Sequence, residues 1–177
     1  MKRLMPLSFL LFVAGCSVSQ PDLTGRWSRQ AEEPAMELSG TEIIEILPDS
    51  TFKVTNRMLF AHNDSDLNSF LNVKVSVYGT WDRTNQGDLL MLYNPQTVSV
   101  DADSTSFTLN MKKADKEIPA EIAAETYADL ITRIKGYYTQ GYGSISANGG
   151  MLLQAPQVID STLYARIGSE IVTWSRP

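Results

Sequence analysis

The chain has 177 residues, of which 43% are hydrophobic and 20% charged, and its formal net charge is −5. This length fits one domain, and the apolar share excludes an intrinsically disordered chain. The acidic balance argues against nucleic-acid binding, which needs clustered Lys and Arg. The chain holds a single Cys and a single His, which excludes a disulfide scaffold and Cys/His zinc sites. We therefore expect no nucleic-acid partner and no cofactor.

Residues 1–15 have the composition of a signal peptide. Lys2 and Arg3 give a positive start, and the stretch 4–13 that follows is almost wholly apolar. A membrane-spanning helix needs roughly 20 apolar residues, so this stretch is too short to remain as a transmembrane anchor. The sequence therefore predicts a signal peptide that is removed on export.

Val13-Ala14-Gly15-Cys16 resembles the lipobox of bacterial lipoproteins. The resemblance implies a diacylglycerol on Cys16, cleavage just before it, and a lipidated tether over residues 16–22. The alternative is an ordinary signal peptide whose Cys lies near the cleavage site by chance. A lone thiol in an exported protein is open to oxidation, which acylation prevents. We therefore expect an exported protein of the bacterial cell envelope. The lipid on Cys16 would anchor it to the outer membrane, which is its membrane partner.

Alternation of apolar and polar residues, the mark of half-buried strands, fills most of residues 23–177. The apolar positions of the clearest runs are Phe52, Val54, Met58 and Phe60, then Leu71, Val73, Val75 and Val77, then Phe107, Leu109 and Met111. Further strand candidates are Thr41–Leu47, Leu89–Tyr93 and Ile171–Trp174.

Turn signals separate these runs at short intervals. They are Pro48-Asp49-Ser50, Gln86-Gly87-Asp88, Asn148-Gly149-Gly150 and Gly168-Ser169, the third and fourth predicting hairpins. Short connections join antiparallel strands, because parallel strands need long crossovers. We expect a single mostly β domain over residues 23–177, an antiparallel barrel or sandwich of about 8–10 strands.

One segment has helical spacing instead. Its apolar positions are Ala123, Tyr127, Leu130, Ile131, Ile134 and Tyr138. Pro119 suits a first helical turn and Gly136 a helix end. The spacing predicts one inserted helix near residues 119–135, packed on the outside or an open end of the sheet.

A Trp-x-Arg motif occurs three times, as Trp27-Ser28-Arg29, Trp81-Asp82-Arg83 and Trp174-Ser175-Arg176. Residues two apart on a strand face the same side, so each Trp has an Arg beside it. An Arg from one strand can then stack on the Trp of another. We predict structural roles for Trp27, Trp81, Trp174 and Arg176, with Trp27 and Trp81 packed where the barrel closes.

The segments 22–27, 47–52 and 79–90 together resemble the opening of lipocalin-like domains in small bacterial lipoproteins. The matching motifs are Gly25-Arg26-Trp27, the turn Asp49-Ser50-Thr51-Phe52, and Gly79-Thr80-Trp81. The resemblance implies a lipocalin-like barrel for residues 23–177. It departs from the family's order in one respect, because several strand-like runs follow the helix where lipocalins have one.

The sequence nominates no catalytic or metal site. Asp64-Ser65-Asp66 matches the start of a calcium loop, but the required Gly and Glu positions hold Ser69 and Val75. A nucleophilic triad would need His62, which lies at the start of a polar loop. No pair of carboxylates stands out for glycoside hydrolysis. We therefore expect a protein that is not an enzyme and binds no metal.

The candidate ligand-binding residues are Tyr137, Tyr138, Tyr142 and Val75. The tyrosines form a Gly-rich stretch, 136–143, that is either a flexible aromatic loop or a helix cap leading into a strand. Val75 would line an apolar cavity if the barrel is hollow. The sequence thus leaves two leading functions: a non-enzymatic envelope lipoprotein that binds a small apolar molecule or glycan, and an envelope protein-interaction module, such as an accessory subunit or inhibitor, with a filled barrel and an unknown protein partner.

Overall fold

The structure is a computed structural model that describes residues 20–33, 38–63, 67–111 and 118–177. The predicted signal peptide, Cys16 and the Asp64–Asp66 segment lie outside these residues.

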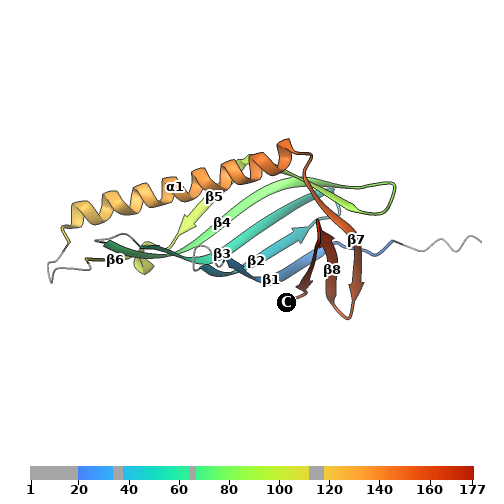
Figure 1. The fold of residues 1–177 in the computed structure, drawn as a ribbon, viewed down its shortest axis with the longest axis horizontal. Coiled ribbons are helices and arrows are strands. Elements are labelled where there is room, and N and C mark those ends of the chain that lie inside the picture. Colours follow the sequence, from blue (N-terminus) through green and yellow to red (C-terminus); the bar gives the residue numbers. More distant parts are fainter. Residues whose placement is uncertain (1–19, 34–37, 64–66, 112–117) are drawn as a thin grey trace, which may run out of the picture.

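Nine antiparallel strands and one long helix make up the described part of the chain (Figure 1). In chain order they are β1 (Gly25–Glu33), β2 (Leu38–Ile46), β3 (Thr51–Asn63), β4 (Leu67–Arg83), β5 (Leu89–Ala102), β6 (Thr108–Met111), α1 (Ala120–Ala147), β7 (Met151–Ile159), β8 (Thr162–Ile167) and β9 (Glu170–Ser175). A short 3-10 helix, Ser104–Ser106, precedes β6.

The strands form a closed barrel. The sheet order is β3-β2-β1-β9-β8-β7-β5-β4-β6, and a further pairing of β3 with β4 joins the ring. Strand β6 lies outside the ring, against the start of β4. The predicted mostly β fold, an antiparallel barrel with one inserted helix, is therefore confirmed, and the barrel form replaces the sandwich.

Three of the four predicted turns are confirmed. The 48–50 segment joins β2 to β3, the 86–88 segment joins β4 to β5, and Gly168-Ser169 joins β8 to β9 with Gly168 at φ +60°. The prediction for Asn148-Gly149-Gly150 is wrong, because this segment joins α1 to β7 and no hairpin forms there. Both of its glycines have a positive φ, near +95°, which explains the turn-like composition.

Helix α1 has 28 residues and ends at Ala147, well past the predicted end at residue 135. Gly136 stands in open space with nothing within 4 Å of an added Cβ, so nothing in its surroundings ends the helix. The segment 136–143 is therefore helical, and neither predicted form, a flexible loop or a cap before a strand, is correct. Figure 1 shows α1 lying along the long strands β4 and β5, with β7 to β9 at one end of the molecule.

The core lies between the inner faces of the strands and α1. Its fully buried members include Trp27, Phe52, Val75 and Trp174, and the helix adds Leu130 and Ile134. Gly79 is a packing requirement of this core, because a Cβ there would lie 2.4 Å from the Phe52 ring. Phe52 and Gly79 are opposite each other on β3 and β4, so the ring covers the bare backbone of its partner.

Candidate functional site

Strands β1 and β9 close the barrel through two reciprocal Arg–Trp contacts. Among the described residues their pairing register has one position, Ser28 opposite Ser175. On one side of this pair, the Arg176 guanidinium lies 4.7 Å from the centroid of the Trp27 ring. On the other side, the Arg29 guanidinium lies 5.0 Å from the centroid of the Trp174 ring. Each strand therefore supplies an Arg to the Trp of the other, and cation–π attraction supplements a very short hydrogen-bonded ladder.

Glu42 of β2 holds the second of these contacts in place. Its Oε1 accepts a 2.7 Å hydrogen bond from Arg29 Nε and a 2.9 Å bond from Trp174 Nε1. The side chains of Arg29 and Glu42 are 30% and 18% exposed. The Arg29–Glu42 pair is mostly shielded from water, and the same Glu42 oxygen also accepts from the Trp174 indole. These bonds fix the orientations of the Arg29 and Trp174 side chains.

An aromatic and polar group under α1 adjoins this pair. Tyr93 of β5 stacks on Tyr142 of α1 with a 4.7 Å centroid distance, and Asn56 Nδ2 donates a 2.9 Å hydrogen bond to the Tyr142 hydroxyl. Burial raises the pKa of both tyrosines well above the usual range, and the negative charge of Glu42 adds to the effect. Both hydroxyls are therefore neutral at physiological pH, and the group anchors the helix to the sheet.

Beyond Ser28 and Ser175 the two strands separate and leave a pocket of about 560 Å³ in the barrel wall, which we call the seam pocket. Its lining residues are Ser28, Arg29, Gln30, Thr41, Ile171, Val172, Thr173 and Ser175. Among these described lining residues the one charged side chain is Arg29, which pairs with Glu42. The volume lies within the usual range for ligand sites, and the lining is more polar than that of most.

The backbone of β9 presents unpaired groups to this pocket. Ile167 and Glu170 flank a two-residue turn and face each other in the register of β8 and β9. They therefore form a hydrogen-bonded pair, as do Val172 and Trp174 with their β8 partners. The N–H and C=O groups of Ile171 and Thr173 must then point away from β8, toward β1, where the register has no partner for them.

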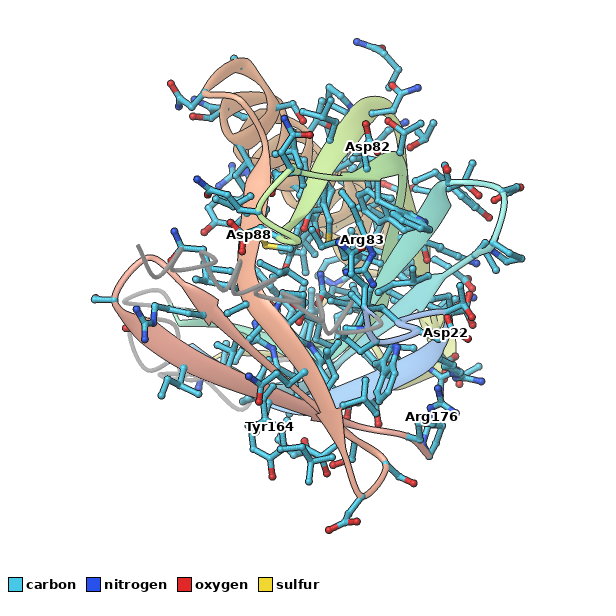
Figure 2. The ribbon with its side chains drawn as sticks, turned by 90° about the vertical axis from the view of Figure 1, so that its right-hand side faces the viewer. Asp22, Asp82, Arg83, Asp88, Tyr164 and Arg176 are labelled. Atoms are coloured by element: carbon cyan, nitrogen blue, oxygen red, sulfur yellow. The ribbon has the colours of Figure 1, made fainter. Side chains whose placement is uncertain are left out.

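The opposite end of the seam is closed by the N-terminal segment. Figure 2 shows Asp22, Arg83 and Arg176 at this end of the barrel. Arg83 donates a hydrogen bond to the Pro21 carbonyl, and Arg176 Nη2 donates one of 3.3 Å to the Thr24 carbonyl. Asp22 accepts bonds from the N–H and the hydroxyl of Thr24, which lower its pKa, the backbone bond most. These contacts fix residues 20–24 across the barrel end.

The residues that the sequence nominated as ligand-binding lie near one another: the Tyr138 ring is 5.4 Å from that of Tyr137 and 5.9 Å from that of Tyr142, and Asn56, opposite Val75, bonds the Tyr142 hydroxyl. Tyr137 is 60% exposed on α1, whereas Val75 has no accessible surface in the core. Tyr138 and Tyr142 face the sheet, where the Tyr138 hydroxyl donates to Met58 Sδ at 3.1 Å. None of the four lines either of the two pockets described here, and their role in ligand binding stays a prediction.

The Trp residues differ in burial. Trp27 and Trp174 are fully buried, while Trp81 is half-buried and donates a 3.0 Å hydrogen bond from Nε1 to the Leu47 carbonyl. Trp81 also lies on β4, away from the β1–β9 seam. The stacking of Arg on Trp thus joins the first and third motifs.

A second pocket, of about 510 Å³, lies over β3 to β5 and is lined in part by Arg57, Lys74 and Asp101. Of its four charged lining residues, Arg57, Lys74, Asp101 and Asp103, Lys74 and Asp101 pair at 3.2 Å. The described residues hold no group of three metal-binding side chains. His62 lies within β3, opposite Ser69, and not in a loop as predicted.

Sequence reasoning missed the seam pocket and the two inward-facing polar residues Glu42 and Asn56. Glu42 and Asn56 are polar residues on strands, and they were not singled out as facing inward. Their phase was nonetheless readable, because Glu42 is two residues from Ile44 and Asn56 is two from Val54. Ile171 and Thr173 carried no signal, since the separation of β1 from β9 is a property of the closed barrel.

Comparison with protein-family models and with curated proteins found no match for this chain. Among the described residues, no helix is both long enough and apolar enough to cross a bilayer.

Proposed function

We propose that this chain is a non-enzymatic lipoprotein of the bacterial cell envelope, with a lipocalin-like barrel that acts as a protein-interaction module, such as an accessory subunit or inhibitor. A lipid on Cys16 would anchor it, at the outer membrane. The observation that carries the proposal is the lack of accessible surface on Leu71, Val75 and Val77 inside the barrel.

Three inward side chains of β4 leave no room for a ligand beside them, whereas a fourth, Val73, borders the second pocket. Leu71, Val75 and Val77 have 0% exposed surface. A void that could hold even one water would leave accessible surface on its lining, so no such void adjoins these residues. Helix α1 adds the buried side chains of Leu130 and Ile134 to the same core. A barrel packed in this way supports recognition on the outside better than carriage of a molecule inside.

The position of the N-terminal segment supports anchoring close to the membrane. Residues 20–24 are bound across one end of the barrel by Arg83 and Arg176. A chain spans at most about 3.6 Å per residue, so a lipid on Cys16 lies within about 15 Å of Gln20. This end of the barrel would then face the bilayer.

A second candidate function is binding of a small molecule, and the seam pocket favours it. The pocket has about 560 Å³ and a lining rich in hydroxyl and amide groups. Such a lining suits a glycan better than an apolar molecule, because the hydroxyls of a sugar pair with polar groups of both kinds.

Two measurements test the proposal. Intact mass spectrometry of the mature protein should find acylated Cys16 at the N-terminus, and Cys16→Ser should move the protein from the detergent fraction to the soluble fraction. A lipophilic dye should show no saturable binding, and Val75→Trp should cost about 1–3 kcal/mol by overpacking. Saturable dye binding that Val75→Trp abolishes, with the fold retained, would favour the carrier function instead.

A further inference from the structure

We propose that the β9 edge of the seam pocket binds an extended segment of a partner protein, which adds to β9 as a further antiparallel strand. This inference rests on the proposed interaction function and names the kind of partner and the place where it docks.

The first argument is the pattern of free backbone groups. Ile171 and Thr173 direct their N–H and C=O groups away from β8. The backbone groups of Ser175, two residues further on, point the same way and face Ser28 of β1. Donors and acceptors therefore recur at every second residue along one edge. An extended peptide has the same repeat, of about 6.8 Å, whereas a sugar has not.

The second argument is the space beside this edge. The seam pocket occupies the place where the ladder of β1 and β9 would continue past Ser28 and Ser175. Strand edges that natural proteins leave open are usually blunted by charges, Pro or a covering element. Here the edge residue Ile171 is instead 73% exposed, more than any other described large hydrophobic side chain.

The third argument is charge, and it defines the partner's chemistry. Arg166 of β8 is opposite Ile171, is exposed, and forms no ion pair with another described residue. Arg29 in the pocket lining is already paired with Glu42, so Arg166 is the charge that selects the partner. An acidic side chain placed opposite Ile171 on the added strand would lie on the same face of the sheet as Ile171 and Arg166. The added strand and β8 would be roughly 10 Å apart, a distance that the acidic side chain and Arg166 together can span. The expected partner segment therefore carries an acid between apolar residues on its outward face.

The test uses the protein purified from the producing cells in detergent, labelled with 15N, and the peptide acetyl-Val-Thr-Glu-Thr-Val-amide as the probe. We expect saturable backbone amide shifts at Ile171 and Thr173, with cross-strand contacts to the peptide. The same peptide with every amide N-methylated should bind at least tenfold more weakly, because it lacks the donors of the ladder.

Two variants of one residue complete the design. Thr173→Pro removes an N–H that β8 does not use and should weaken peptide binding at least tenfold. Thr173→Val keeps that N–H and should bind within about twofold of the unsubstituted protein. If Thr173→Pro fails to fold, the N-methylated peptide still decides the question.

Several outcomes would overturn the inference. The first two are an absence of peptide-induced shifts at Ile171 and Thr173, and equal binding of the N-methylated peptide. The third is a set of shifts at these residues with chitooligosaccharides but not with the peptide. The fourth is a set of concentration-dependent shifts without peptide, which would identify a second copy as the occupant. The intact mass of the same sample reports the lipid on Cys16, and dye binding reports a hollow barrel. The mass and dye measurements therefore test the proposed function, while the peptide shifts test the β9 site, so the failure of one is distinguished from the failure of the other.

Discussion

Arg176, two residues from Trp174 in the sequence, stacks on Trp27 of the opposite strand at 4.7 Å from the ring centroid. Arg29 returns the contact by lying over Trp174. Two Trp-x-Arg motifs that are far apart in the chain thus exchange their arginines across the seam between β1 and β9. The contacts compensate for a pairing register of one position, and they leave the rest of the β9 edge free.

Trp27→Ala should cost about 3–5 kcal/mol of unfolding free energy, because the ring is completely buried and its Nε1 donates to the Leu23 carbonyl at 2.8 Å. Trp81→Ala should cost less, since Trp81 is half-buried. Denaturant titration of both variants measures the two costs. A change below about 1 kcal/mol for Trp27→Ala would contradict the packing described here.

Glu42→Ala should destabilise the protein by about 1–3 kcal/mol, because it removes the acceptor shared by Arg29 and the Trp174 indole. The double variant with Arg29→Met should lose less than the sum of the two single variants, since the removed partners depend on each other. A double-mutant cycle by thermal or chemical unfolding gives the coupling. Strict additivity would mean that the pair contributes nothing.

Gly79→Ala should cost about 1–3 kcal/mol, because the added methyl group meets the Phe52 ring and the Leu92 carbonyl. Gly141→Ala is the matched control: the site is helical and nothing lies within 4 Å of the added Cβ. This second change should stabilise the protein by about 0.5–1 kcal/mol through helix propensity. A neutral or stabilising effect of Gly79→Ala would show that the surroundings of Gly79 are misassigned.

Asp22 should titrate below the ordinary Asp pKa of about 3.9, because Thr24 donates two hydrogen bonds to its carboxylate. A depressed folded-state pKa stabilises the fold above the unfolded value, and this contribution is lost as the pH falls through the folded value. The Thr24 amide shift, followed by NMR against pH, reports the titration. Asp22→Asn should abolish this transition, and a midpoint at or above 3.9 would refute the assignment.

The period-two alternation was enough to predict the β architecture. Most inward positions of the two longest runs, Phe52–Phe60 and Leu71–Val77, are apolar, and their side chains pack in one core. The helix start near Pro119 followed from the same kind of reasoning. Its end did not, because Gly136 and Gly141 are tolerated where packing of Tyr138 and Tyr142 on the sheet outweighs a weak local preference.

The seam lay beyond sequence reasoning for a different reason. The Trp-x-Arg motifs indicated that arginines stack on tryptophans of other strands, but not which strands meet. That choice depends on barrel closure, which also determines that β9 meets β1 at Ser28 alone and that Ile171 and Thr173 face a pocket. No local pattern in residues 170–175 distinguishes a paired edge from an open one.

Amide hydrogen exchange along β9 tests the open seam most directly. The account predicts an alternation, with slow exchange at Val172 and Trp174, which bond to β8, and fast exchange at Ile171 and Thr173, which face the pocket. Protection of the Thr173 amide equal to that of Trp174 in the unbound protein would mean a closed ladder between β1 and β9, and would contradict the account.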